Sequence, residues 1–497
     1  MGEYLLQAPI GSEQKPQERL ISTYRSSRKY HLHGDDHKNY QQQYGDMYFF
    51  RLAKLKPSLK QIAAEDWSDF EIGDEVAQHK DRVLDVRQGE LCWIIGTIYM
   101  DMPLKPNVLE DISKDRWISA PPPREKYLSP DDQDLMWIED ESGRLRLVGT
   151  VLQTIMLVTG SIVGVMGTEN SQGAFEVIDV KLPDLARQPQ RWEMEDGDAT
   201  LTNGTSNKRR ISERPGGNTG RKVALVSGLG ITGEEGDLLR IDLLMEYLTG
   251  EVSGDDDEQA VSKISRLIIA GDSIGRVTVK ADQDEQLTRK SVKKYGYDAS
   301  AYNPAPTTHL DNFLATLLPS IPITLLPGEM DPTSVAMPQQ PLHPAMLPRS
   351  RAYTSIPLAE NPGWFDTTTN PWEGDIDGWR FMGNGGQPIN DIFKYVEGDD
   401  RLDMMESVLR WRIGAPTAPD TLWCYPYQDK EPFVIEESPH VYFVGNQPKF
   451  ETSIIDGPSQ QSIRLIALPK FKETGEIVIL DLDTLEPEVV RFDVLED

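Results

Sequence analysis

The chain has 497 residues, of which 38% are hydrophobic and 26% are charged, and it contains 39 glycines and 35 prolines. Single hydrophobic cores rarely grow beyond about 250 to 300 residues, so two or more globular domains are expected, and the composition excludes a fibrous or fully disordered protein. The net charge of −29 disfavours unaided binding to a phosphate backbone, and two cysteines are too few for a disulfide framework or a zinc cluster.

The residue pattern in the first part of the chain predicts a polar arm followed by a small barrel. Residues 1–44 show neither helical nor strand periodicity, which predicts a flexible arm. Residues 47–67 carry apolar and basic residues at helical spacing, which predicts a helix leading into the first domain. Short β-rich runs follow, at 82–86, 91–100, 134–140, 144–150, 155–167 and 175–182. Five or six curved strands without intervening helices predict a closed barrel over 45–186, for which the oligonucleotide/oligosaccharide-binding (OB) barrel is a candidate.

The residue pattern in the second part of the chain predicts a linker and an α/β domain. Residues 187–221 have almost no side chains that could enter a core, so we expect a disordered linker or a long surface insertion. Over 222–497, buried strands alternate with helices, which predicts a layered α/β domain. The expected strands cover 223–229, 266–273, 323–331, 440–450, 462–471 and 476–494, and the expected helices cover 235–250 and 310–318.

Four of these strands end in short polar loops. The loops are Ser227–Leu229, Gly271–Ser273, Gly328–Asp331 and Gly445–Pro448. Strand ends that meet at one edge of an α/β sheet are the usual place for ligands and catalytic groups. We therefore expect a candidate site where these loops converge.

The order and spacing of the loops resemble the calcineurin-like metallophosphoesterases, in which DxH, GDxxD, GNHD and GHxH loops hold two divalent metals. A two-metal site needs several carboxylate and imidazole ligands around both ions. Seven of the corresponding positions differ here: Ser227, Leu229, Gly275, Glu329, Met330, Asn446 and Pro448. Only Asp272, at the position of the bridging carboxylate, and Asp331 remain. The loss of these ligands implies an inactive site without metal or other cofactor. The residues themselves favour a structural role, in which the glycines form tight turns and Asp272 caps a helix.

Longer strings resemble the small (B-type) subunits of replicative DNA polymerases, most specifically those of polymerase delta. They include PQQPLH (338–343), PDTLWCYP (419–426) and VGNQPKF (444–450), in that order. The resemblance covers about residue 45 to the C-terminus. It implies an OB-type barrel joined to an inactive phosphoesterase-like domain over 222–497, and a non-catalytic scaffold role in DNA replication and repair.

The same resemblance implies partners and location. The partners would be the cysteine-rich C-terminal module of the catalytic polymerase subunit and a third subunit, with DNA contacted only indirectly and with no membrane. The location would be the nucleus. Two other functions stay open on the residues alone: a metal-dependent phosphoesterase or nuclease, and a single-stranded oligonucleotide-binding module that stacks bases on Trp93 or Tyr99. Both aromatics lie in apolar runs, which favours core packing.

Overall fold

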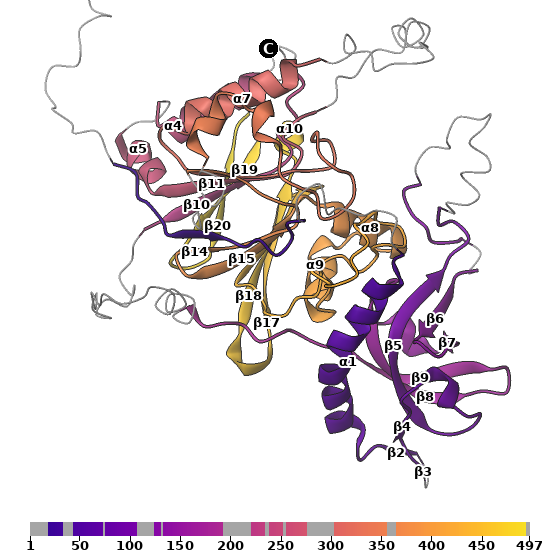
Figure 1. The fold of residues 1–497 in the computed structure, drawn as a ribbon. Coiled ribbons are helices and arrows are strands. Elements are labelled where there is room, and N and C mark those ends of the chain that lie inside the picture. Colours follow the sequence, from indigo (N-terminus) through magenta and orange to yellow (C-terminus); the bar gives the residue numbers. More distant parts are fainter. Residues whose placement is uncertain are drawn as a thin grey trace, which may run out of the picture.

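The computed structural model describes ten segments of the chain, 18–32, 43–72, 75–106, 124–130, 133–191, 220–233, 238–251, 255–275, 303–354 and 364–493. They form a small β-barrel domain and a larger α/β domain, and helix α1 (Gly45–Trp67) lies against the barrel on the side that faces the larger domain (Figure 1). No helix within these segments is long and apolar enough to cross a membrane.

The barrel is built from five main strands, β5 (Cys92–Asp101), β6 (Leu135–Glu139), β7 (Arg144–Val148), β8 (Ile162–Glu169) and β9 (Ala174–Lys181). They pair in the order β5-β6-β7-β9-β8, and β8 pairs again with β5, so the sheet closes on itself. Strands β7 and β9 are parallel, whereas the other pairs of this ring are antiparallel. The closed barrel predicted from the sequence is confirmed.

Shorter elements complete the barrel domain: β2 (Glu71–Ile72), β3 (Glu75–Val76), β4 (Gln78–His79), η3 (Val83–Asp85) and η4 (Thr150–Gln153). The strand predicted at 82–86 is therefore wrong, because this segment forms a single 3-10 turn that buries only Val83. Of the strand predicted at 155–167, only the part from Ile162 is extended.

Glycines give the barrel its curvature and leave room for α1. The register between β8 and β9 shifts at Met166/Gly167, and a Cβ atom on Gly167 would lie 2.0 Å from the Glu176 carbonyl oxygen. A Cβ atom on Gly164 would touch the Trp67 ring of α1 at 3.6 Å. Gly167 therefore marks a bulge, and Gly164 leaves room for a helix side chain.

The α/β domain contains two six-stranded sheets packed face to face. The first has the order β13 (Phe365–Thr367), β12 (Ile323–Leu326), β11 (Ile264–Ala270), β10 (Lys222–Val226), β19 (Glu476–Asp481), β20 (Pro487–Arg491). The second has the order β1 (Tyr24–Ser26), β14 (Trp372–Ile376), β15 (Trp379–Asn384), β16 (Val441–Gln447), β18 (Ser462–Pro469), β17 (Glu451–Asp456). This confirms the layered α/β domain, and the β-rich segment expected over 476–494 forms the β19–β20 hairpin.

Helices cover the outer faces of the two sheets. Those of the first sheet are α4 (Leu238–Thr249), α5 (Asp255–Ser262) and α7 (Ala305–Leu317), and those of the second are α8 (Gln387–Tyr395) and α9 (Arg401–Arg410). The short elements η7 (Pro344–Met346), η8 (Ser350–Tyr353), η9 (Pro458–Gln460) and α10 (Phe471–Thr474) lie in the connections. One apolar cluster includes both barrel residues and residues of α8, α9 and the second sheet, so the two domains share a core.

Residues 18–32 differ from the flexible arm predicted for 1–44, because they lie along the α/β domain as an N-terminal strap. Strand β1 pairs antiparallel with β14, and the Arg19 guanidinium donates to the carbonyl oxygens of Leu248, Val261 and Ile264. Tyr24 stacks on Trp372. The prediction was wrong here because the strap has few apolar residues and is held by backbone pairing and side-chain hydrogen bonds.

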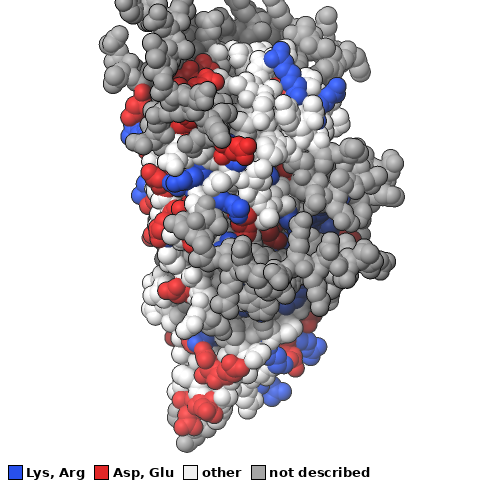
Figure 2. Space-filling view, turned by 90° about the vertical axis from the view of Figure 1, so that its left-hand side faces the viewer, with Lys and Arg blue, Asp and Glu red and all other residues white. Residues whose placement is uncertain are grey.

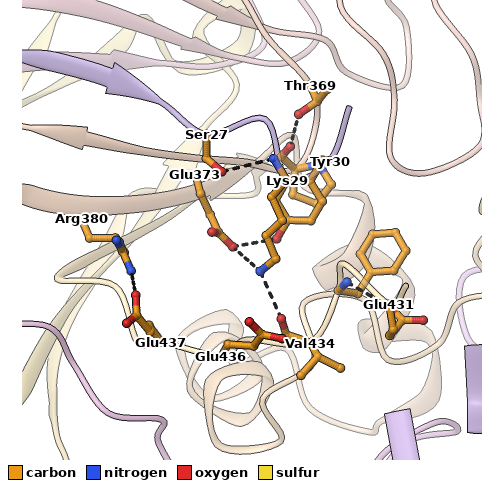
Figure 3. Close-up of polar contacts among 12 residues, drawn as sticks. Ser27, Lys29, Tyr30, Thr369, Glu373, Arg380, Glu431, Val434, Glu436 and Glu437 are labelled. Atoms are coloured by element: carbon orange, nitrogen blue, oxygen red, sulfur yellow. Dashed lines mark hydrogen bonds and ion pairs between the residues drawn. The ribbon is translucent and has the colours of Figure 1, made fainter. Parts of the chain in front are cut away.

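The end of the strap reaches the boundary between the domains. Figure 3 shows Lys29 and Tyr30 pointing toward Glu373 of β14: the Tyr30 hydroxyl donates to its carboxylate at 2.9 Å, and the Lys29 Nζ atom lies 2.8 Å away. The Tyr30 side chain is buried in an apolar cluster that also includes Trp67 of α1 and Phe433. The end of the strap therefore packs in an apolar cluster to which both domains contribute side chains.

The linker predicted for 187–221 lies mostly outside the described residues, which end at 191 and resume at 220. Its first residues are packed on the α/β domain: the Gln188 amide donates to the carbonyl oxygens of Pro439 and Ser462, and Arg191 donates to that of Asp377. For 187–191 the predicted linker is wrong, because polar side chains can bind a domain through hydrogen bonds without entering its core.

Candidate functional site

The four polar loops converge, as the sequence predicted, where β10, β11, β12 and β16 end. The Gly228 N–H donates to the Gly271 carbonyl oxygen at 2.9 Å. The Asn446 N–H donates to the Ser227 hydroxyl, also at 2.9 Å. One contact within the first sheet and one between the two sheets therefore hold the loops together at this edge.

Gly271 lies close to the backbone of two neighbouring loops. Its φ angle is +85°, and a Cβ atom there would lie 3.0 Å from the Cα of Gly385 and 3.1 Å from the Cα of Gly328. A left-handed backbone and the lack of space each favour glycine. This position joins the loops by backbone contact and offers no functional group.

Asp331 is buried and binds three backbone amides. Its carboxylate accepts the N–H groups of Gly328 at 2.7 Å, Ile274 at 3.0 Å and Ser273 at 3.3 Å. Burial raises its pKa to about 6, although the three amide donors act in the opposite direction. The side chain thus fastens the loop after β11 to the loop after β12.

Asp272 plays a related part from the other loop. Its Oδ1 atom accepts the Met330 N–H at 2.9 Å, and its backbone has a φ of +52°. Burial raises its pKa. The prediction that Asp272 caps a helix is wrong for the part of the loop that the structure describes, residues 271–275, because no helix begins there.

Ser227 and Asn446 are buried and connect the two sheets. The Ser227 hydroxyl donates to the Pro469 carbonyl oxygen at 2.9 Å while it accepts the Asn446 N–H. The Asn446 side chain donates to the Gly385 carbonyl oxygen at 2.9 Å. The Ser227 hydroxyl and the Asn446 amide nitrogen thus bind backbone groups, whereas the buried Asn446 Oδ1 atom makes no hydrogen bond with the described residues.

The side chains of the remaining predicted positions take no part in these contacts. Leu229 is part of the apolar core beneath the first sheet. Gly275 donates to the Ile231 carbonyl oxygen, and a Cβ atom there would lie 2.5 Å from the Gly230 oxygen. Three positions have exposed side chains: Glu329, Met330 and Pro448.

The donor set does not fit the two metal ions that the resembled phosphoesterases hold. Within the described segments, no group of three or more His, Cys, Asp or Glu side chains is arranged to hold a metal ion. The two retained carboxylates, Asp272 and Asp331, already accept backbone N–H groups, and the four loops supply no imidazole. Such a site needs several carboxylate and imidazole ligands.

Sequence reasoning missed a buried amide network beside this edge. Gln339 donates to the Gly328 carbonyl oxygen at 2.9 Å, and its own side-chain oxygen accepts from Asn370 at 2.9 Å and Gln387 at 2.8 Å. The sequence held one sign of this network: Gln339 and Asn370 each stand next to a proline, in the strings PQQP and TNPW.

The aromatics considered for base stacking separate into two environments. Trp93 is buried and packs on Trp67 and His79, which agrees with core packing. Tyr99 is half-buried and lines a cavity next to α1. On the face shown in Figure 2, acidic and basic side chains of the described residues lie interspersed and form no continuous basic stripe.

Comparisons with known proteins agree with both domains. Residues 43–180 match the family model described as the DNA polymerase delta subunit OB-fold domain, and residues 223–452 match the family model of the DNA polymerase alpha/epsilon B subunits. The OB-type barrel and the phosphoesterase-like α/β domain are therefore confirmed.

Relatives match along nearly the whole chain. The DNA polymerase delta small subunit of Saccharomyces cerevisiae is 34% identical over 92% of this chain and 91% of its own length. That of Oryza sativa subsp. japonica is 33% identical over 93% and 96%, and DNA polymerase delta subunit 2 of Drosophila melanogaster is 30% identical over 96% and 99%. The chain belongs to the family of DNA polymerase delta small subunits, which are accessory subunits of the replicative DNA polymerase.

Proposed function

We propose that this subunit is non-catalytic and acts as a scaffold of the polymerase delta complex. The observation that carries the proposal is the commitment of the loop side chains to structure. The carboxylates of Asp272 and Asp331 accept backbone amides, and the Ser227 hydroxyl joins two sheets. A phosphoesterase would need these positions for metal ligands or for a general acid.

The proposed partners are the cysteine-rich C-terminal module of the catalytic subunit and a third subunit of the complex. Two joined domains with a shared core offer broad surfaces for stable protein contacts. The net charge of −29 supports an indirect rather than a direct contact with DNA. The proposed location is the nucleus, where the complex replicates DNA.

Hydrolysis assays test the non-catalytic role. The purified subunit is expected to show no manganese- or magnesium-dependent hydrolysis of phosphodiesters. Asp272→Ala is the matched variant, because a contaminating nuclease would act equally in both preparations. Hydrolysis by the wild-type subunit that disappears in Asp272→Ala would overturn the proposal in favour of a metal-dependent phosphoesterase.

Co-expression tests the partners. The subunit is expected to co-migrate with the C-terminal module of the catalytic subunit and with the third subunit in gel filtration, and to do so at moderate salt, because stable interfaces depend chiefly on apolar burial. A subunit that fails to co-migrate, yet binds single-stranded DNA tightly by itself, would favour the oligonucleotide-binding module.

A further inference from the structure

A cavity of about 490 Å³ lies where the first turns of α1 cross the barrel. We call it the junction cavity. Its walls come from α1, from β5, from the end of β6, from the β6–β7 turn and from Thr159. The full lining is Gly45, Tyr48, Phe49, Leu52, Thr97, Ile98, Tyr99, Glu139, Asp140, Glu141, Arg144 and Thr159.

The lining combines aromatic and acidic side chains. Tyr48, Phe49 and Tyr99 supply three rings, and the Phe49 side chain is 59% exposed. An exposed phenylalanine side chain next to a cavity contributes little to the stability of the folded subunit itself. Aromatic anchors beside concave surfaces are typical of protein interfaces.

Three carboxylates in a row, Glu139 to Glu141, face one lining cation, Arg144. Asp140 has a structural role, because it accepts the N–H groups of Val83, Ser142 and Gly143 and so shapes the β6–β7 turn. The other two carboxylates have no such role in the turn. The lining therefore carries an excess of negative charge that the fold does not require.

Glu139 is incompletely neutralised. Its Oε1 atom lies 3.2 Å from a guanidinium nitrogen of Arg144, but this oxygen is buried and makes no hydrogen bond of good geometry with any described residue. Burial also raises its pKa. A further cation that entered the cavity would add to the stabilisation that Arg144 and Lys105 already give the ionised carboxylate.

Lys105, a cation close to the cavity, already has an ion-pair partner. The Lys105 ammonium is paired with Asp420 and lies 4.7 Å from the centre of the Tyr99 ring. The Arg144 guanidinium lies 5.5 Å from the same ring. Lys105 and Arg144 thus both lie over the Tyr99 ring, so the aromatic wall of the cavity is compatible with cations.

We propose that the junction cavity binds a segment of another polymerase subunit in which an apolar side chain lies next to a lysine or arginine. The apolar side chain packs on Phe49 and Tyr48, and the cation binds between Glu139 and Glu141. This inference rests on the proposed scaffold function and adds to it a specific surface. Negative charge and an aromatic floor suit such a segment, whereas they repel a nucleic-acid backbone.

Affinity measurements on the full-length subunit test the proposal. Each remaining subunit of the complex, purified alone, is titrated against wild-type, Phe49→Ala and Glu141→Lys proteins. Both substitutions are expected to weaken the binding of the same partner by about tenfold or more, as the loss of a central anchor does. The effect of Glu141→Lys is expected to shrink at high salt, whereas that of Phe49→Ala should persist.

Matched controls separate this effect from misfolding. Ile454→Ala removes another exposed apolar side chain, on β17, and Glu65→Lys reverses another exposed charge, near the far end of α1. Both are expected to bind like wild type. All four variants should unfold at the wild-type temperature, because the substituted side chains are exposed.

Photo-cross-linking identifies the occupant. A benzophenone amino acid replaces Phe49 in the assembled complex, and the product is sequenced by mass spectrometry. A cross-link to a lysine- or arginine-containing segment of another subunit supports the proposal. A cross-link to this chain or to added single-stranded DNA overturns it, as does wild-type affinity in both variants. If the variants assemble normally, only the cavity proposal fails; if wild-type protein does not assemble, the scaffold proposal fails.

Discussion

The guanidinium of Arg51 in α1 lies 3.4 Å from the carboxylate of Glu431 in the α/β domain, and both side chains are completely buried. Arg51 also donates to the carbonyl oxygens of Pro416 and Ala418, and Glu431 accepts the Phe433 N–H. Each domain thus contributes one charge to the same buried pair, so the charge on either side is compensated only while the domains stay together.

Arg51→Met is therefore expected to lower the free energy of unfolding by roughly 3 to 5 kcal/mol, because it leaves the Glu431 carboxylate buried without its cation. Urea denaturation followed by circular dichroism measures this. The double variant Arg51→Met/Glu431→Gln should recover part of the loss. A single variant as stable as wild type would show that the pair is unimportant for joining the domains.

Asp331 gives a prediction about pH. Its pKa rises from an ordinary 3.8 to about 6 in the folded protein, so the folded state holds a proton that the unfolded state has released between these values. The contribution of this group to the free energy of unfolding therefore falls as pH rises from the unfolded pKa through the folded pKa. Between about pH 5 and pH 7.5 the fall is about 1 to 2 kcal/mol.

Urea titrations of wild type and Asp331→Asn at the two pH values check this. The difference in stability between wild type and variant should change with pH by that amount, because the amide does not titrate. A difference that is the same at both pH values would contradict the raised pKa. Comparing the two proteins removes the contribution of the other carboxyl groups.

Gly271→Ala is expected to destabilise the loop edge by roughly 2 kcal/mol or more. The left-handed backbone alone costs about 1 to 2 kcal/mol for a residue with a Cβ atom, and contacts near 3.0 Å with Gly385 and Gly328 add to this. Gly398→Ala is the control, because the nearest atom to a Cβ there lies 4.0 Å away and its φ is not positive. Equal stability of the two variants would show that a Cβ atom at position 271 is tolerated.

Tyr30→Phe tests the strap. The variant keeps the ring in its apolar cluster but loses the hydrogen bond to the Glu373 carboxylate, which should cost roughly 1 to 3 kcal/mol. Tyr44→Phe, whose hydroxyl donates to the Cys424 carbonyl oxygen from a more exposed side chain, should cost less. Thermal unfolding of both variants shows which one loses more stability. A larger loss in Tyr44→Phe than in Tyr30→Phe would contradict a buried role for the Tyr30 hydroxyl.

The sequence by itself determined the five main barrel strands and seven strands of the α/β domain, whereas β1, β2, β3, β4, β13, β14, β15 and β17 were not predicted. Strands such as β5, β11 and β16 are nearly continuous apolar runs, and such runs specify a buried strand whatever their partners are. The convergence of the four polar loops followed from the same reasoning, because the strands that carry them are buried and β10, β11 and β12 are parallel neighbours.

Only the tertiary structure decided the polar contacts between distant parts of the chain. Tyr30 meets Glu373, and Arg51 meets Glu431, across more than 300 residues of sequence. A charged or polar side chain in a local pattern predicts exposure, since its burial is favourable only when a partner of matching chemistry is in place. The same holds for the junction cavity, whose acidic turn and aromatic helix end belong to segments that the sequence pattern treats separately. Hydrophobic periodicity is local and can be read along the chain, whereas the pairing of buried polar groups depends on three-dimensional proximity.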